Sequence, residues 1–439
     1  MKVLFLCGGS SNRMFPVTRD KFLLNFLGKP LLQHQVEMAQ KAGFNQFIFV
    51  GNKNNLENIR QLINSLPRIE AEFVLQQNPK GIADALISAR PFLNEAILVI
   101  SPNDVFTDSA YNKIVQANNQ ASQSVSSMLG YQVKEYFPGG YLDVDSKANL
   151  KHIVEKPGKG NEPSNLVNIL VHLHRNPQKL LEYINVTEST FDDVYERALD
   201  MMANEGHLIK IIPYADFWAP IKYPWHIFRV MEHYLDNLES YISDSAHVSD
   251  RAIINGNVIL SDNVRVMENA VIKGPAYIGP NSIIGNNTLL RGYCHIGANS
   301  VVGYSTEIKH CYIGDNCWFH SNYVGDSIIE SNCSFGSGAI TANFRLDETN
   351  IHVNINHSKI DTGYDKLGAI VGSGCRIGIN ANLMPGIRVG SNCLVGPHVC
   401  LNEDLMPNKR AMSMAHQYKV TDNFNNSEQN KRQKLLNNL

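Results

Sequence analysis

The sequence predicts an α/β domain with a Rossmann-like sheet, followed by a solenoid of short stacked strands. Strand-like and helix-like stretches alternate from residue 2 to about residue 104, which is the pattern of βαβ units. Further along, aliphatic residues recur at a spacing of six, which neither a helix nor an ordinary strand produces. A chain of 439 residues is also too long for one hydrophobic core, so two or three domains are expected.

The α/β pattern can be followed along the chain. Strands are predicted at residues 2–6, 45–51, 71–76 and 95–104. Helices are predicted at residues 29–43, 56–66 and 81–93. This order predicts a mostly parallel sheet with helices on both faces, and such sheets bind ligands at the carboxyl ends of their strands. The turn at residues 8–13 and the pair Asn103–Asp104 both follow strand ends and are the candidate binding segments.

A connecting helix is predicted at residues 224–238, where aliphatic and aromatic residues recur at helical spacing. His226 and His233 are interpreted as ordinary residues of that helix. The predicted organisation has four parts: a domain at 1–223, a linker at 224–242, the solenoid at 243–405 and a polar tail at 406–439.

The solenoid is predicted from twelve aliphatic rungs. They are Ile278, Ile284, Leu290, Ile296, Val302 and Ile308, then Val371, Ile377, Leu383, Val389, Val395 and Leu401. Each rung is expected to be a short strand on one wall of a prism, with its side chain pointing inward. Gly follows eight of the rungs, and Gly and the polar residues after it are expected to turn the corner, where only a small residue fits the backbone. Chance spacing in a β-sandwich would not hold this register over twelve rungs.

Composition excludes several classes of function. The net charge of −2 provides no positive field for nucleic acid or an anionic membrane. Gly8 interrupts the first apolar run too early for a signal peptide or a spanning helix, so a soluble, cytoplasmic protein is predicted. Seven of the eight Cys lie between Cys294 and Cys400 without any CxxC, which favours small reduced thiols in the solenoid over disulfides or zinc.

The residues of the α/β domain suggest phosphate chemistry. A Gly-rich turn after the first strand lets backbone N–H groups approach phosphate oxygens, and Arg13 and Lys21 add positive charge. Gln76 could read a base edge, with Gly81 packing against the base. Asp104 could provide an oxygen ligand for Mg²⁺ on a triphosphate. Taken singly, these residues are equally compatible with an ordinary turn or a helix cap.

Longer motifs carry a resemblance to a known family. The first 32 residues contain GG-x-x-x-RM-x-P-x-T, a Lys and LGKPLL. The segments QQNPKGIADAL, LVISPNDVF, GGYLDVD, HIVEKPG and NLVNILVH follow in order. Over about residues 1–405 the chain resembles bifunctional sugar-1-phosphate nucleotidyltransferases and amino-sugar-1-phosphate acetyltransferases. The resemblance implies a GT-A-like nucleotidyltransferase domain and a left-handed parallel β-helix, and it implies a homotrimer.

The resemblance implies a nucleotidyl transfer site in the first domain. A sugar-1-phosphate oxygen would attack the α-phosphate of a nucleoside triphosphate, either UTP or dTTP, and release pyrophosphate. Arg13 and Lys21 would be catalytic, and Asp104 would bind Mg²⁺. Gly8, Gly9, Ser10, Gln76 and Gly81 would bind the nucleotide, and Gly140, Glu155, Lys156 and Asn168 would bind the sugar phosphate. Alone, Asn168 would be interpreted as a buried polar residue and Lys156 as part of a solvated turn.

A second site is implied where the ladder is interrupted. HSNYVGDS, followed by GSGAITANF, is similar to the family's acetyltransferase motif. His320 would be the general base that deprotonates the amine of glucosamine- or galactosamine-1-phosphate for attack on acetyl-CoA. Tyr323, Asn343 and Lys366 would belong to the pocket for the sugar phosphate and acetyl-CoA. Thr349 and His352 stand where related archaeal sequences carry Lys.

The chain departs from the family pattern at three places in the first domain. Ser11 and Asn12 replace the usual second Gly and Thr, and the segment from Arg13 to Lys21 is two residues shorter. Pro220 stands where a second metal-ligating Asp is usual, and Lys222 where a Gly is usual. The metal would then rely on Asp104 with water and phosphate, or on Asp216, or Lys222 would replace part of the charge.

Two other functions remain open at this point. One is a single-activity nucleotidyltransferase whose solenoid is structural or regulatory. The other is a non-catalytic nucleotide-sugar sensor, which Pro220 and Ser11 would favour. The His320 motif argues against a purely structural solenoid, because a structural solenoid does not need it.

Overall fold

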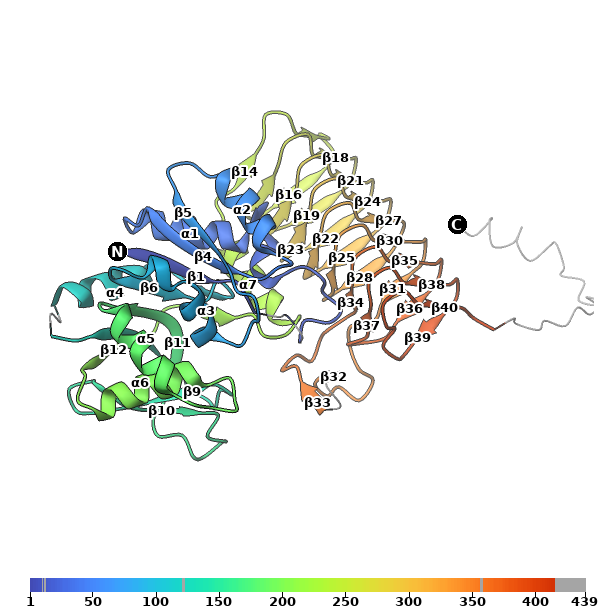
Figure 1. Cartoon of the computed structure of the whole chain (residues 1–439). Helices are drawn as coiled ribbons and strands as arrows, with labels where there is room; N and C mark the ends of the chain where they lie inside the picture. Colours follow the sequence, from blue (N-terminus) through green and yellow to red (C-terminus); the bar gives the residue numbers. More distant parts are fainter. Residues whose placement is uncertain (10, 12, 121–122, 356–357, 415–439) are drawn as a thin grey trace, which may run out of the picture.

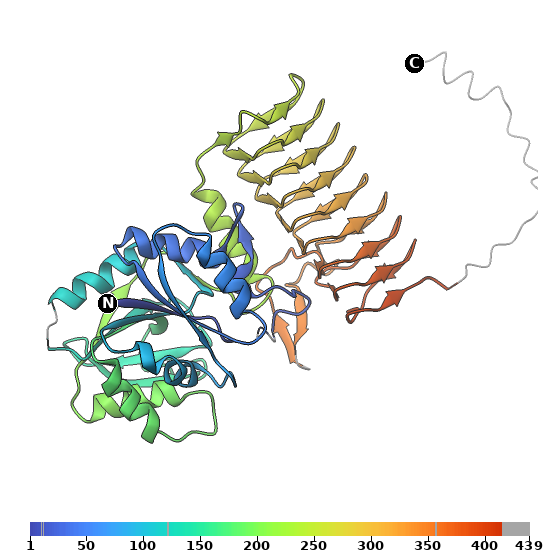
Figure 2. The same cartoon turned by 45° about the horizontal axis from the view of Figure 1, so that its top comes forward.

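A computed structural model describes residues 1–414 except 10, 12, 121–122 and 356–357. Ser10, Asn12 and the tail beyond residue 414 therefore lie outside the described residues. The chain forms an α/β domain and a tapering stack of strands, with helix α7 (His226–Asp236) at their junction (Figures 1 and 2). None of the described helices is long and apolar enough to cross a membrane.

The α/β domain is built on one mixed sheet. Its strands are β1 (Lys2–Leu6), β4 (Gln46–Gly51), β5 (Glu70–Leu75), β6 (Ile97–Ile100), β8 (Ser126–Gln132), β9 (Gly140–Val144), β10 (Leu150–Glu155), β11 (Leu166–His174) and β12 (Ile209–Tyr214). Its helices are α1 (Leu31–Lys41), α2 (Leu56–Asn64), α3 (Ile82–Ser88), α4 (Ser109–Gln120), α5 (Pro177–Val186) and α6 (Val194–Asn204). Alternate residues of β1 pack in different hydrophobic cores. Val3 and Phe5 belong to one core and Leu4 belongs to the other, so both faces of the sheet are buried.

The prediction of a mostly parallel sheet is right only in part. Strands β6, β1, β4 and β5 are parallel, and so are β8 and β12, whereas β11 is antiparallel to β6, β8 and β9. Strands β9 and β10 form a hairpin, which needs no crossover helix. The helix predicted at 81–93 ends at Ser88 and continues as a 3₁₀ turn at Arg90–Phe92, because Pro91 has no N–H for the helix ladder.

Short strands complete this domain beside the site. Strand β7 (Asp104–Phe106) pairs antiparallel with β13 (Trp218–Pro220). Strands β2 (Asn25–Phe26) and β3 (Lys29–Pro30) form a small hairpin, and a 3₁₀ turn covers Lys21–Leu23.

The second half is a three-walled prism of parallel strands, the architecture of a β-helix. One wall contains β14 (Tyr241–Ile242), β17 (Val258–Leu260), β20 (Ala276–Ile278), β23 (Cys294–Ile296), β26 (Cys311–Ile313), β29 (Ile328–Ile329), β34 (Ile370–Val371) and β37 (Arg388–Val389). The second contains β15 (His247–Val248), β18 (Arg265–Val266), β21 (Ile283–Ile284), β24 (Val301–Val302), β27 (Trp318–Phe319), β30 (Ser334–Phe335), β35 (Arg376–Ile377), β38 (Leu394–Val395) and β40 (Arg410–Ala411). The third contains β16 (Ile253–Asn255), β19 (Val271–Lys273), β22 (Leu289–Arg291), β25 (Glu307–Lys309), β28 (Tyr323–Gly325), β31 (Ile340–Thr341), β36 (Asn382–Leu383) and β39 (Cys400–Leu401). All twelve predicted rungs are buried in its core, as expected.

At the corners, the Gly and the polar residues after it have separate roles. The residue in the left-handed region lies three positions after a rung and is most often Asn, as at Asn281, Asn287 and Asn299. The Gly directly after a rung is required by close stacking. A Cβ on Gly297 would lie 2.5 Å from the backbone carbon of Gly314 on the next coil. Asn263, Asn281 and Asn299 also form a side-chain hydrogen-bonded ladder along one corner.

An excursion leaves the prism between β31 and β34. It forms the hairpin β32 (His352–Ile355) and β33 (Ser358–Asp361), which projects beside the α/β domain (Figure 2). Register continues across the excursion, because Thr341 of β31 still pairs with Leu383 of β36. The cysteines are free thiols; six of the seven in the prism are buried and Cys400 is exposed.

The two halves share one hydrophobic core. Side chains from the α/β domain, from α7, from the prism and from the excursion pack in a single cluster. Its members include Met14, Leu24 and Phe26, then Trp225 and Phe228, then Tyr277, Tyr312, Ile328 and Ile370, and finally Ile351 and Val353.

Candidate functional site

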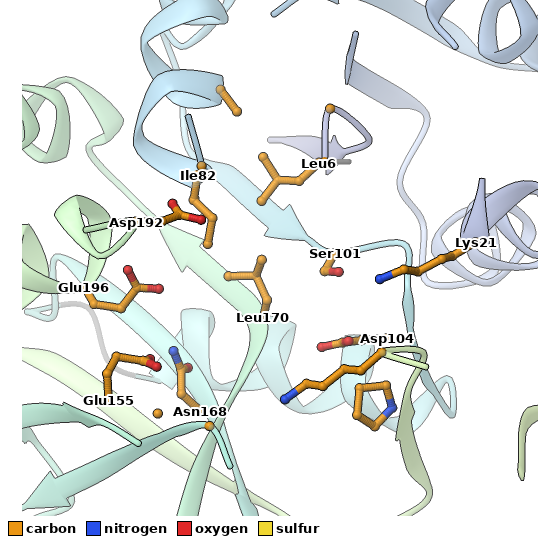
Figure 3. Close-up of a pocket in the computed structure, with 18 of the residues that line it drawn as sticks. Leu6, Lys21, Ile82, Ser101, Asp104, Glu155, Asn168, Leu170, Asp192 and Glu196 are labelled. Atoms are coloured by element: carbon orange, nitrogen blue, oxygen red, sulfur yellow. The ribbon is translucent and has the colours of Figure 1, made fainter. Parts of the chain in front are cut away.

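One cavity of about 620 Å³ opens at the carboxyl ends of β1 and β6. Eleven of the twelve predicted site residues of the α/β domain line this cavity. They are Gly8, Gly9, Arg13, Lys21, Gln76, Gly81, Asp104, Gly140, Glu155, Lys156 and Asn168. The twelfth, Ser10, lies outside the described residues. Lys21 and Asp104 lie at one end, and Glu155 and Asn168 lie at the other (Figure 3).

The Gly-rich turn is fixed by its own domain at its start. Asn55 donates from Nδ2 to the carbonyl of Cys7 at 3.0 Å, and Asn52 donates from Nδ2 to the carbonyl of Gly8 at 3.1 Å. Both asparagines come from the connection between β4 and α2. Since the Gly8 carbonyl is held from outside, the turn keeps its position at the mouth of the cavity.

Gln76 has less freedom to read a base than the sequence suggested. Its amide nitrogen donates to the carbonyl of Gly81 at 3.1 Å and to a carboxylate oxygen of Asp84 at 2.7 Å. Its Oε1 faces Gly8, where a Cβ would lie only 2.0 Å away. The amide oxygen is therefore the only group left to face a ligand, and it can only accept a hydrogen bond.

Gly81 fits its position for two reasons. Its φ of +94° lies in the region that favours glycine, and a Cβ would overlap the carboxylate of Asp192. The residue begins α3 and places the backbone against the cavity.

The end of the cavity near Asp104 carries three cations and one carboxylate. Burial lowers the pKa of Lys21, and Arg13 nearby lowers it further. Burial also lowers the pKa of Lys222 to about 8, against the attraction of Asp104. Burial raises the pKa of Asp104, opposed by Lys222 and Lys21. Lys222 extends along the Phe137 ring, 4.1 Å from its centroid, and donates to the carbonyl of Pro138 at 3.2 Å.

Of the candidate metal ligands Asp104, Asp216 and the residue at position 220, only Asp104 can bind a metal in this cavity. Pro220 is the direct cross-strand partner of Asp104 in the β7–β13 pair and offers no ligand. Asp216 accepts from the Ser109 hydroxyl at 2.5 Å and does not line the cavity. Among the described residues, no cluster of three acidic, His or Cys side chains could hold a metal. One carboxylate together with substrate phosphate oxygens still suits Mg²⁺, which seldom uses an all-protein cage.

The end of the cavity near Glu155 is acidic. Glu155 packs against Gly140, whose Cβ would lie 2.4 Å from a carboxylate oxygen. Asp192 and Glu196 face the same space (Figure 3). Burial, together with the neighbouring carboxylates, raises the pKa of Glu196 to about 8. Carboxylates at this end can accept hydrogen bonds from sugar hydroxyls.

Asn168 is held by a buried relay that the sequence did not reveal. Its Oδ1 lies 2.8 Å from His172 Nε2, at a bulge in the β11–β8 pairing. His172 Nδ1 lies 2.7 Å from the Tyr195 hydroxyl, which lies 2.8 Å from His174 Nε2. His174 Nδ1 lies 2.8 Å from the Ser126 hydroxyl.

The donors in this relay can be assigned in order. Burial lowers the pKa of His172 well below its usual range and that of His174 to about 3, so both rings are neutral. His172 must donate to Asn168, so its other nitrogen accepts from Tyr195. Tyr195 then accepts from His174, which accepts from Ser126. This order turns the Asn168 amide nitrogen, a donor, toward the cavity.

The predicted acetyl transfer residues lie on the prism and on its excursion and are brought together in part. Asn343 Nδ2 lies 3.2 Å from the Tyr323 hydroxyl and 2.5 Å from a carboxylate oxygen of Asp326. Lys366 pairs with Phe344, next to Asn343. His320 is exposed at the corner before β28, and within the described part of the chain its ring shares no hydrogen bond with this group.

Asp326 organises this second group, although the sequence reasoning did not select it. Besides Asn343, its buried carboxylate accepts from Lys309 at 2.8 Å and from His310 at 3.0 Å. His310 Nε2 lies 2.8 Å from Glu232 of α7. Asp326 is the last residue of the HSNYVGD motif, which was the available signal. The His172–Tyr195 relay had no comparable signal.

Family comparisons cover both halves of the chain. The nucleotidyl transferase model matches residues 2–218, and the bacterial transferase hexapeptide model, of six repeats, matches residues 257–292 and 368–403. A bifunctional protein GlmU of Methanococcus maripaludis is 37% identical over 412 residues, which covers 93% of this chain and 96% of that protein. A bifunctional sugar-1-phosphate nucleotidylyltransferase/acetyltransferase of Sulfurisphaera tokodaii is 31% identical, over 92% of this chain and 98% of that protein. A bifunctional protein GlmU of Methanocaldococcus jannaschii is 31% identical, over 93% of this chain and 96% of that protein.

Proposed function

The chain belongs to the family of bifunctional nucleotidyltransferases/acetyltransferases with a left-handed β-helix, and we propose that it makes an activated N-acetylated sugar. The cavity of the α/β domain would transfer a nucleotidyl group from UTP or dTTP to a sugar-1-phosphate. The prism would transfer an acetyl group from acetyl-CoA to glucosamine- or galactosamine-1-phosphate. We place both reactions in the cytoplasm.

The nucleotidyl step needs alignment and charge neutralisation rather than a covalent intermediate. A phosphate oxygen of the sugar-1-phosphate attacks the α-phosphorus of the triphosphate. The bond from the α-phosphorus to the bridging oxygen of the β-phosphate breaks, and pyrophosphate leaves. Arg13, Lys21 and Lys222 are the cations available to the transferring group. A Mg²⁺ ion, held by Asp104 and phosphate oxygens, would neutralise further charge.

Two amides support the choice of substrates. The Gln76 oxygen accepts only, which suits the imide N–H of uracil or thymine. The Asn168 nitrogen donates into the cavity, which suits an acceptor oxygen on the sugar, such as an acetamido carbonyl. Gly8 and Gly9 hold the nucleotide phosphates in this proposal, and Gly140, Glu155 and Lys156 hold the sugar phosphate.

In the acetyl step, His320 takes a proton from the amine, and the amine nitrogen attacks the thioester carbonyl. The C–S bond breaks, and CoA leaves as the thiol after protonation. Tyr323, Asn343 and Lys366 would bind the sugar phosphate or acetyl-CoA. We propose a homotrimer, because His320 is exposed on the outside of a single prism and a neighbouring copy would enclose it.

The single observation that carries the proposal is the meeting of all eleven described motif residues in one cavity. The test incubates the protein with glucosamine-1-phosphate, acetyl-CoA, Mg²⁺ and each nucleoside triphosphate, and separates the products. Asp104→Ala should abolish nucleotidyl transfer alone, and His320→Ala should abolish acetyl transfer alone. If each variant keeps both activities, the two sites are assigned wrongly.

A further inference from the structure

Glu330 of the prism contacts the loop that carries Arg13 and Lys21. It follows β29, and its Oε1 accepts from the backbone N–H of Thr18 at 2.9 Å and of Arg19 at 3.1 Å. Its Oε2 accepts from the Thr18 hydroxyl and from the backbone N–H of Ser373, each at 3.0 Å. Four donor groups, three of them on the α/β domain, converge on this one carboxylate.

The environment of Glu330 makes these bonds necessary. The residue is 6% exposed, and no ion pair reaches it within the described part of the chain. Burial raises the pKa of its carboxyl, and the donors from Thr18 and Arg19 oppose that change. A buried carboxylate without a cation is costly unless its lone pairs accept hydrogen bonds. The loop backbone at Thr18–Arg19 and the carboxylate therefore hold each other in place.

Two more contacts from the prism meet the same loop. The guanidinium of Arg388 lies over the Phe15 ring, 5.0 Å from its centroid. The backbone at Gly372 packs so closely on Pro16 that a Cβ would lie 2.8 Å from the Pro16 carbonyl oxygen. Figures 1 and 2 show the N-terminal loop reaching the prism in both views. The loop is thus fixed at its start by its own domain and at its middle by the prism.

We propose that Glu330 is a positioning residue for nucleotidyl transfer, supplied by the prism to a site in the other domain. It touches no substrate. It fixes Thr18 and Arg19, and so sets where Arg13 before them and Lys21 after them meet the triphosphate. Misplacement of such groups by about 1 Å can reduce the rate about a hundredfold. The inference rests on the proposed nucleotidyl transfer in the α/β cavity.

The first test is Glu330→Gln, which keeps the size of the side chain but points an amide NH₂ at backbone N–H donors. The kcat of nucleotidyl transfer should fall about tenfold or more, with the KM for the sugar-1-phosphate nearly unchanged. Acetyl transfer should be retained, because within the described part of the chain Glu330 forms no hydrogen bond with His320 or Tyr323. Glu268→Gln is the matched control. Its carboxylate accepts from Asn286 on the next coil, at 2.6 Å, and both activities should stay at the wild-type level.

The second test reads the contact without turnover. Hydrogen–deuterium exchange of the peptide spanning residues 13–21, without substrate, should be faster in Glu330→Gln than in the wild type or Glu268→Gln. Thr18→Ala combined with Glu330→Gln should lose less kcat than the product of the single losses, because the two side chains share one bond.

Three results would overturn the proposal. One is a parallel loss of both activities with a lowered melting temperature, which is a general folding defect. Another is unchanged exchange at residues 13–21, which means that the contact is absent. The third is unchanged kcat despite faster exchange. A wild-type protein that transfers no nucleotide would instead refute the proposed function, and the exchange experiment distinguishes that case because it needs no activity.

Discussion

At the scale of single residues, Tyr195 connects the two histidines that orient Asn168. Tyr195→Phe would leave a buried nitrogen on each of His172 and His174 without its partner, which costs about 1–3 kcal/mol of unfolding free energy. The freed Asn168 should also raise the KM for the sugar-1-phosphate. Urea unfolding and steady-state kinetics measure the two effects. Tyr183→Phe is the matched control, since its hydroxyl bonds Glu205 and His207 away from the cavity. Equal KM values for both variants would contradict the relay.

The metal requirement can be tested at Pro220. Because Pro220 is the cross-strand partner of Asp104, Pro220→Asp places a second carboxylate beside the first. The Mg²⁺ concentration for half-maximal nucleotidyl transfer should fall by about threefold or more. Asp104→Asn should raise it or abolish activity. An unchanged Mg²⁺ dependence in Pro220→Asp would show that the metal does not sit between these strands.

His310 gives the junction between α7 and the prism a pH dependence. Burial disfavours its charged form, but hydrogen bonds to Asp326 and Glu232 outweigh this and raise its pKa above 6.5. A raised pKa in the folded state stabilises the protein fully below the unfolded pKa, and that contribution is lost as pH rises through the folded pKa.

The melting temperature should therefore fall as pH rises from about 6 through the raised pKa. His310→Asn, which tolerates the φ of +49°, should remove this slope. Burial opposes the charged form of Asp326, but hydrogen bonds from His310, Lys309 and Asn343 outweigh it and hold the pKa of that carboxyl below its usual range, so its charge does not change here. The same slope in the variant would assign the effect to another group.

Residue identities in the first site were largely predictable, and their orientations were not. The motifs specify which residues follow strand ends, and strand ends meet at one edge of a sheet. The direction of the Gln76 and Asn168 amides depends on Asp84, His172 and Tyr195. Asp84 and Tyr195 come from other elements, and His172 meets Asn168 at a bulge in the strand that they share, so none of the three carries a local signal. Pro220 was predicted to replace a ligand, and its pairing with Asp104 is consistent with that interpretation.

At the scale of elements, Gly and Asn have separate roles at the prism corners. Gly297→Ala should destabilise the prism by about 1–3 kcal/mol, because its Cβ would strike the next coil. Asn299→Ala should cost about 1–2 kcal/mol because of its φ of +55°, and Asn299→Gly should cost less. Urea unfolding compares the three variants. If Asn299→Gly were as damaging as Asn299→Ala, the side-chain ladder rather than the backbone would be the main contribution.

The spacing of six was enough to predict the prism, because most of the inward positions along the coils are aliphatic. It could not distinguish the two reasons for a small residue at a corner. The sheet of the α/β domain was predicted less well. A helix between two strands indicates that the strands are parallel, whereas antiparallel pairing leaves no such pattern in the sequence. Strand β11 is antiparallel to β6 and β8, which are not adjacent to it in the chain, so no local sequence specifies the direction of pairing.

At the scale of the whole molecule, the shared core ties both activities to an intact chain. A fragment of residues 1–223 would expose Met14, Leu24 and Phe26, which pack on α7 and the prism. It should bind a hydrophobic dye and lose nucleotidyl transfer even though it contains every residue of the cavity. Adding the separate fragment 224–439 tests whether the halves reassemble. A fully active fragment of residues 1–223 would contradict this dependence.

The excursion at residues 342–369 has a consequence for how such a protein can diversify. The walls resume on the far side with their pairing intact, as Thr341 and Leu383 demonstrate. The length and composition of the departing segment are therefore decoupled from the pitch of the coils. Exchanging this segment between homologues should change which amino sugar is acetylated and leave the coils unaltered. The specificity for the amino sugar can therefore evolve separately from the scaffold.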